Sequence, residues 1–124
     1  MTIKRLLDKK EHAATTTSPE TTVYDALKLM AEKEIGALVV LEDDKMVGIF
    51  SERDYARKVI LKGKSSQDTL VREIMTTKVL HASPDQKLGK CLSLMTKKRF
   101  RHLPVLENGR LVGILSIEDV KSIL

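Results

Sequence analysis

The sequence predicts a mixed α/β (α+β) fold in which two β-α-β-β-α repeats pack sheet to sheet with pseudo-twofold symmetry. The first observation is an internal repeat, because residues 17–59 match residues 82–124 at a constant offset of 65 without a gap. The second observation is size. One repeat of about 60 residues would be marginal alone, and its sheet would keep one uncovered face. Two units packed together would bury these faces.

The first repeat is interpreted from hydrophobic spacing and turn residues. Apolar residues recur at helical spacing from Val23 onward, and Thr22 with Asp25 forms a capping-box pattern that starts this helix. The continuous apolar runs that follow are typical of buried strands. The expected elements are a strand at 15–17, a helix from 23, strands at 37–41 and 46–50, and a helix from 51 to about 61.

The second repeat gives the same order of elements. Its hairpin signal is clear, because Asn108-Gly109 stands between two apolar runs and both residues tolerate a positive φ. The expected elements are a strand at 79–82, a helix at 88–98, strands at 103–106 and 111–115, and a helix from 116. Short helical segments at 3–7 and 71–75 lead into the repeats. We therefore divide the chain into repeat 1 with its lead-in (1–62), a polar connector (63–70) and repeat 2 (71–124).

Composition indicates a globular protein of the cytoplasm. Hydrophobic residues make up 42% and charged residues 31% of the 124 residues, which is unlike a disordered chain. No apolar run approaches the roughly 18 residues expected of a membrane span, and the N-terminus lacks the apolar core of a signal peptide. Cys91, the single cysteine, is interpreted as a small core residue in a reducing compartment. No membrane partner is expected.

The positive charge is concentrated in the second half. Through Lys62, eleven Lys and Arg face eleven Asp and Glu, whereas eleven face six afterwards, which accounts for the net charge of +5. The densest run is Lys97 to His102. Such a run is either a solvated helix end, where cations suit the helix dipole, or a surface that faces an anion. Two Phe, two Tyr and no Trp argue against a base-stacking platform, so nucleic acid is not the expected partner.

A tetrad recurs where the second hairpin strand of each repeat ends, at Ser51 to Asp54 and at Ser116 to Asp119. Taken alone, Ser followed by Asp three residues later is a capping box, worth roughly 1 kcal/mol of helix stability. Three observations favour a ligand. Gly48 and Gly113 precede the tetrads, and a strand glycine often marks close approach of backbone or ligand. A helix N-terminus attracts an anion, and a carboxylate beside it can accept both hydroxyls of a ribose.

The ordered set of motifs resembles a cystathionine β-synthase (CBS) domain. The matching residues are Ser83-Pro84, an apolar helix, Arg101 to Leu106, Asn108-Gly109, Leu111 to Ser116 and Asp119, with 71–76 similar to the lead-in of such domains. Two copies in tandem resemble a stand-alone Bateman module over nearly the whole chain. The resemblance implies a regulatory protein, not an enzyme, that binds AMP, ATP, NAD or S-adenosylmethionine between its repeats. It also implies a homodimer, a separate effector protein and no required cofactor.

The resemblance further implies two pockets, each built from both repeats. One joins Thr15, Thr16, Ile35, Gly36 and Ala37 with Ser116 and Asp119. The other joins Leu80, His81, Phe100, Arg101 and His102 with Ser51, Arg53 and Asp54. Backbone and apolar groups would hold adenine, either aspartate the ribose hydroxyls, and the two arginines with His102 the phosphate. Because the second pocket gathers more positive charge, a phosphate-bearing ligand is expected to prefer it. Val39 departs from the family pattern, which has a proline there, as at Pro104.

Two other functions stay open at this point. One is binding of a nucleic acid or an acidic partner by the basic second half, and the other is a dimerisation module whose pockets bind nothing. Helix faces with residues such as Leu29, Leu94 and Ile123, which one small core would leave uncovered, favour a homodimer. The histidines His12, His81 and His102 lack the helical spacing of metal ligands. No nucleophile with a base stands out, so neither a metal site nor an enzyme is expected.

Overall fold

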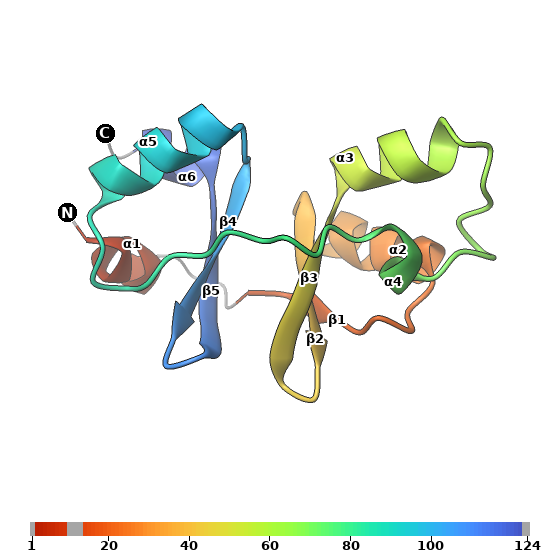
Figure 1. Ribbon diagram of the computed structural model, residues 1–124, viewed down its shortest axis with the longest axis horizontal. Helices are drawn as coiled ribbons and strands as arrows, with labels where there is room; N and C mark the ends of the chain where they lie inside the picture. The colour runs from red at the N-terminus through yellow and green to blue at the C-terminus, as the bar shows by residue number, and fades with distance from the viewer. Residues whose placement is uncertain (1, 10–13, 123–124) are drawn as a thin grey trace. The chain divides into compact units, whose positions relative to one another are not determined.

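The computed structural model describes residues 2–9 and 14–122, and the chain forms two compact units (Figure 1). The central unit is Thr15–Val79, and the terminal unit combines Met1–Ala14 with Leu80–Leu124. Each unit mixes helices with one small sheet. The α+β fold class expected from the repeat is therefore confirmed.

The central unit is built on a three-stranded sheet with the order β1-β2-β3. Strand β1 (Thr16–Thr17) runs parallel to β2 (Ala37–Glu42), and β2 pairs antiparallel with β3 (Lys45–Ser51). The helical elements are α2 (Val23–Lys33), α3 (Glu52–Tyr55), the π-helical turn η1 (Ala56–Ile60) and α4 (Val71–Ile74). One apolar core joins these helices to the strands, and its largest side chain, Phe50, is completely buried.

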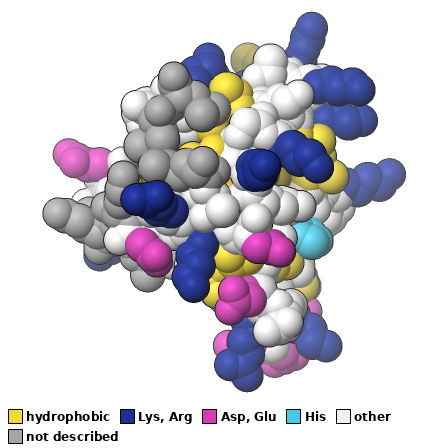
Figure 2. All heavy atoms as spheres, turned by 90° about the vertical axis from the view of Figure 1, so that its left-hand side faces the viewer, with side chains coloured by type: hydrophobic (Ala, Val, Ile, Leu, Met, Phe, Trp, Pro, Cys, Tyr) yellow, Lys and Arg dark blue, Asp and Glu magenta, His cyan; other side chains and the backbone are white. Residues whose placement is uncertain are grey.

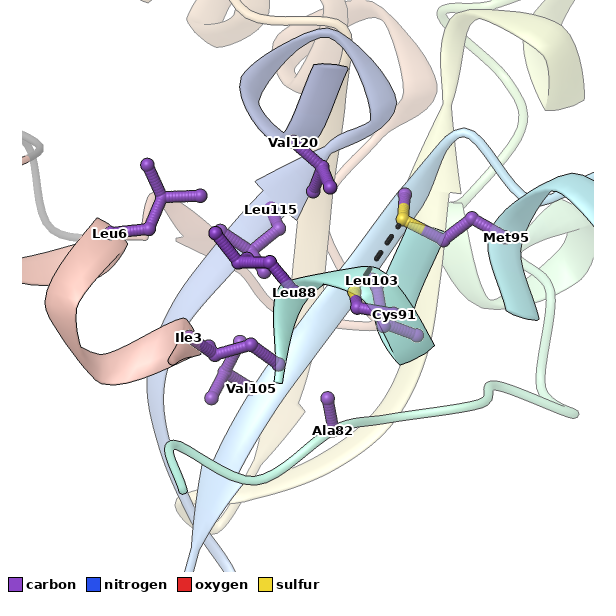
Figure 3. Close-up of a cluster of buried hydrophobic side chains, with 10 residues drawn as sticks. All are labelled: Ile3, Leu6, Ala82, Leu88, Cys91, Met95, Leu103, Val105, Leu115 and Val120. Carbon is purple, nitrogen blue, oxygen red and sulfur yellow. Dashed lines mark hydrogen bonds between the residues drawn. The ribbon is translucent and has the colours of Figure 1, made fainter. Parts of the chain in front are cut away.

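The terminal unit is built on the hairpin of β4 (His102–Glu107) and β5 (Arg110–Ser116). Helices α1 (Ile3–Lys9), α5 (Leu88–Lys98) and α6 (Ile117–Lys121) pack on this hairpin through one apolar cluster (Figure 3). Cys91 belongs to that cluster, as its helical position predicted, and its Sγ lies 3.8 Å from Met95 Sδ. Burial raises the pKa of the Cys91 thiol, which keeps this group neutral within the core.

Local sequence signals account for most element ends. The Asn108-Gly109 turn is confirmed, with φ of 53° and 79°, and Asp43-Asp44 adopts the same left-handed conformation in the hairpin of the central unit. The side chain of Thr22 caps α2, because its hydroxyl accepts a hydrogen bond from Asp25 N at 3.1 Å. The expected helix after residue 51 forms, but its second half is the π-helical turn η1.

The predicted strand at 79–82 does not form, and this prediction was wrong. The segment makes only an isolated parallel bridge at Ala82. In the central unit, a hydrogen bond from Val39 N to Thr15 O at 3.4 Å extends the corresponding strand β1. Pro104 occupies the position of Val39 in the second repeat, and proline has no N–H to donate. The second bridge that would make a strand therefore cannot form.

Each lead-in helix packs on the other repeat: α1 precedes the first repeat but packs on the second, and α4 precedes the second repeat but packs on the first. Ile3 N donates to Gln86 O at 2.8 Å, which attaches α1 to the second repeat. Val71 N donates to Thr21 O at 2.8 Å, which attaches α4 to the first repeat. The two contacts are equivalent, since Thr21 and Gln86 are 65 residues apart. The side chains of Ile3 and Val71 are both completely buried. The predicted repeat limits, 1–62 and 71–124, are continuous in sequence. In the compact units, each lead-in helix instead belongs with the other repeat.

Some expectations concern residues whose surroundings are only partly described. Leu29 and Leu94 are half-buried, whereas Ile123 and His12 lie outside the described residues. The homodimer stays a prediction. Within residues 2–9 and 14–122, no helix is long and apolar enough to cross a membrane. In the same ranges, no three His, Cys, Asp or Glu side chains are grouped so as to hold a metal ion.

Candidate functional site

The first tetrad forms the N-terminus of α3 in the central unit. Ser51 N donates to Asp54 Oδ2 at 3.0 Å, and Asp54 N donates to Ser51 Oγ at 3.2 Å, which completes a capping box. The hydroxyl of Ser51 also donates to Asp54 Oδ2 at 3.1 Å. The capping interpretation of these two residues is therefore confirmed. Any role toward a ligand would be additional to this structural one.

The second tetrad repeats this geometry at the start of α6 in the terminal unit. Ser116 N donates to Asp119 Oδ2 at 2.9 Å, and Asp119 N donates to Ser116 Oγ at 3.0 Å. Both residues are half-buried, whereas Asp54 in the first tetrad is only 7% exposed. The two carboxylates are thus equivalent in backbone geometry but differ in their access to solvent.

In the central unit, the backbone that enters β2 lies beside the tetrad. Gly36 O accepts a hydrogen bond from Glu52 N at 3.1 Å, and Ala37 is paired with Ser51 in the sheet. The structure therefore brings together four predicted site residues of this repeat: Gly36, Ala37, Ser51 and Asp54. Of the other predicted residues in this repeat, Arg53 belongs to the tetrad itself and is exposed, whereas three are half-buried: Thr15, Thr16 and Ile35.

In the terminal unit, the backbone that enters β4 is placed in the same way. Arg101 O accepts a hydrogen bond from Ile117 N at 2.8 Å, and His102 is paired with Ser116. Four predicted residues are again brought together: Arg101, His102, Ser116 and Asp119. Of the others, Phe100 is half-buried before the strand, whereas Leu80 and His81 are exposed in the segment that fails to form a strand. The sharing of each pocket between the repeats stays a prediction.

The cations expected to meet a phosphate have different surroundings. Arg101 Nη2 lies 2.6 Å from Glu118 Oε1 within the terminal unit, and the two side chains are 55% and 62% exposed. An ion pair this exposed contributes about 0–1 kcal/mol. A phosphate can therefore compete with Glu118 for the guanidinium. Arg53 is exposed in the first turn of α3.

Two residues near Asp54 were missed by the sequence analysis. Lys58 Nζ lies 3.1 Å from Asp54 Oδ1, and Thr76 Oγ1 donates to the same oxygen at 3.0 Å. The spacing of Asp54 and Lys58 is i, i+4, so a search for helical ion pairs could have found the lysine. Thr76 is 22 residues away in sequence, and no local signal indicates its contact with the carboxylate.

The glycines before the tetrads are explained by the protein's own chain. A Cβ atom on Gly48 would lie 2.8 Å from Met75 Sδ and 2.9 Å from Thr76 O. A Cβ atom on Gly113 would lie 2.7 Å from Leu7 Cδ2. In both units, therefore, the segment after a lead-in helix or the helix itself occupies the space beside the glycine. The expectation of close approach is confirmed, but its cause is packing, so the glycines no longer support a ligand.

Comparison with known proteins identifies a family that both halves match. A family model for the CBS domain matches residues 11–61 and 71–124. The chain is 44% identical over 104 residues to the CBS domain-containing protein CBSX3, mitochondrial, of Arabidopsis thaliana. That match covers 80% of this chain and 50% of the relative. The chain thus spans about half the length of the curated relatives that it matches first, 50% and 55% of them.

Solved structures of CBS-domain proteins have the same fold. A signal-transduction protein with CBS domains from Burkholderia ambifaria MC40-6 is 48% identical with a TM-score of 0.95, and the match covers 100% of this chain and 94% of that one. The CBS domain pair of protein MJ0100 is 26% identical with a TM-score of 0.84, covering 99% and 94% of the two chains. That pair was solved in complex with 5′-methylthioadenosine and S-adenosyl-L-methionine.

Proposed function

The chain belongs to the CBS-domain family as a tandem pair, and from this premise we propose that it is a regulatory module that senses an adenine nucleotide, AMP, ATP or NAD. Its relatives are described as CBS-domain and signal-transduction proteins. The two ligands of the MJ0100 pair both contain adenosine, which supports this ligand class. In this proposal a separate effector protein of the cytoplasm receives the signal.

The observation that carries the proposal is the tetrad at the strand–helix junction of the terminal unit. Asp119 is half-buried and held by Ser116, so the carboxylate has a fixed orientation at low entropic cost to a ligand. A carboxylate accepts strong hydrogen bonds from hydroxyl groups, such as those of a ribose. The side chain of Arg101 lies next to the same junction and can exchange Glu118 for a phosphate. A nucleotide needs both kinds of group.

We expect AMP, ATP or NAD to bind, and Asp119→Asn to weaken this binding. The amide oxygen of asparagine still accepts the hydrogen bond from Ser116 N, but it lacks the negative charge that strengthens bonds to ribose hydroxyls. Loss of a charge-assisted bond predicts roughly a tenfold or greater loss of affinity. Isothermal titration of the wild type and the variant with AMP measures this difference.

The matched control is Asp68→Asn, which changes an exposed aspartate of the connector. Its affinity for AMP should equal that of the wild type. Titration with GMP and UMP tests whether adenine itself is recognised. The absence of saturable binding of AMP, ATP and NAD at millimolar concentration would contradict the proposed function, and equal affinity in Asp119→Asn and wild type would contradict the role of Asp119.

A second candidate function is binding of an acidic partner by helix α5. From Lys87 to Leu106 the chain carries six Lys or Arg and no Asp or Glu, whereas the equivalent residues 22–41 carry two Lys against three Asp or Glu. The exposed side chains of α5 and its ends that supply this charge are Lys87, Lys90, Lys97, Lys98, Arg99 and Arg101. Figure 2 shows Lys and Arg side chains standing out from this side of the molecule.

This second function predicts binding that depends on charge and not on nucleotide structure. Duplex DNA serves as a generic polyanion, and its affinity should fall steeply as salt rises. The double substitution Lys97→Glu/Lys98→Glu should weaken DNA binding and leave AMP binding unchanged. Fluorescence anisotropy with labelled duplex at two salt concentrations measures this. Failure to bind DNA at low salt would contradict this candidate and leave the nucleotide proposal standing.

A further inference from the structure

We infer that Lys58 competes with a ligand for Asp54 and thereby weakens the binding of ribose hydroxyls in the central unit. The inference rests on the proposed function, because it concerns access to one of its two carboxylates. Lys58 Nζ lies 3.1 Å from Asp54 Oδ1 and donates to Ile74 O at 3.0 Å. One ammonium group therefore connects the carboxylate to the end of helix α4.

The acceptor capacity of Asp54 is fully used by the protein. Among the described residues, four donors reach its carboxylate. Oδ2 accepts from Ser51 N and Ser51 Oγ, and Oδ1 accepts from Thr76 Oγ1 and Lys58 Nζ. A carboxylate offers about four lone-pair sites. A ribose can therefore bond to Asp54 only by displacing one of these donors.

Of the four donors, Lys58 is the one that a ligand can displace most easily. Its side chain is 43% exposed, so its ammonium can be hydrated when it leaves the carboxylate. The two bonds from Ser51 belong to the helix cap. Thr76 is held in place by its backbone, because its N and O both pair with Ile49 at 2.9 Å. Displacing Lys58 breaks its ion pair with Asp54, and this cost lowers the affinity of the ligand.

The second repeat has other residue types at the positions of Lys58 and Thr76. At the repeat offset of 65, the position of Lys58 corresponds to an isoleucine at 123, a residue outside the described part of the chain. The lead-ins are related by an offset of 68, because Ile3 and Val71 make equivalent bonds. At that offset Thr76 corresponds to Asp8, which has no proton to donate when ionised. The pairing of a lysine and a threonine with the tetrad aspartate is therefore a feature of the first repeat's sequence.

The contacts of Asp54 act against the preference that the charge pattern predicts. The charge pattern of the sequence favours the side of Asp54 for a phosphate-bearing ligand. The contacts of Asp54 oppose ribose binding at the same place, since Lys58 already neutralises and bonds to the carboxylate. For a ligand without phosphate, only the second effect operates. Adenosine is therefore the ligand that isolates the effect of Lys58.

The test is titration with adenosine in an Asp119→Asn background, where the acceptor under study is Asp54. Lys58→Met should tighten adenosine binding by about three- to tenfold, because the displaced bond is charge-assisted but half exposed. Lys62→Met, which removes an exposed cation four residues on, should leave the affinity unchanged. Adding Asp54→Ala to Lys58→Met should abolish the gain. A purely structural role of Lys58 would lower the melting temperature without tightening adenosine binding.

The outcomes separate this inference from the proposed function. Unchanged or weaker adenosine binding by Lys58→Met, with binding by the wild type intact, would overturn the inference and leave the proposed function standing. No adenosine binding by the wild type or any variant would overturn both. If Lys58→Met does not fold, Thr76→Val removes the other donor to Oδ1 and should tighten adenosine binding in the same direction.

Discussion

Replacing Ile3 with alanine is expected to lower the free energy of unfolding by about 3 kcal/mol, as for other truncations of buried aliphatic side chains. Ile3 is completely buried within the core of the terminal unit, together with residues of α5, β4 and β5. Ile3 precedes the first repeat in sequence, but the loss of stability should therefore appear in the second repeat. Urea denaturation measures the loss, and hydrogen exchange measures its location.

Hydrogen exchange should accelerate in α5 and in the β4–β5 hairpin, with less change in β2 and β3. The control is Lys4→Ala, because Lys4 is exposed and its backbone bond to Pro84 O does not depend on the side chain. That variant should lose no more than about 0.5 kcal/mol. Faster exchange confined to residues 15–61 in Ile3→Ala would show that α1 packs on the repeat that follows it in sequence.

Gly48→Ala should destabilise the protein by about 2 kcal/mol, which is typical of adding a carbon to a packed site. The new methyl group would lie 2.9 Å from Thr76 O, a backbone atom. That oxygen accepts a hydrogen bond from Ile49 N at 2.9 Å, so it cannot withdraw without breaking the pairing. The neighbouring Met75 side chain can move, but the backbone cannot. Thermal unfolding followed by circular dichroism measures the effect.

Gly113→Ala is the matched variant and should cost less than about 1 kcal/mol. Here the new methyl group meets only Leu7, whose Cδ2 lies 2.7 Å away at the far end of a flexible side chain. Rotation of Leu7 can relieve the contact. Equal losses of stability in Gly48→Ala and Gly113→Ala would show that the backbone of Thr76 is not the obstacle.

Features that depend on contacts within a few residues were predictable from the amino-acid sequence. The repeat at an offset of 65 predicted two equivalent units, and the Asn108-Gly109 turn predicted a hairpin that the structure contains. The tetrads predicted helix caps, since a serine and an aspartate three residues apart can bond each other's backbone. Eleven-residue helix α5 begins and ends where its apolar spacing predicted. These turn, cap and helix signals involve residues close together in the chain, so a single sequence is enough to detect them.

Contacts between distant segments, in contrast, were not predictable and are known from the folded structure. Pro104 prevents the strand predicted at 79–82, because the missing N–H matters only once that segment lies against β4. The apolar pattern of each lead-in helix shows that one face is buried, but not which repeat buries it. Thr76 donates a hydrogen bond to Asp54 from 22 residues away, after the chain has passed through α4. Hydrophobic burial is non-directional. An apolar pattern therefore shows that a helix face is buried, but the element that covers this face depends on the three-dimensional arrangement of the chain.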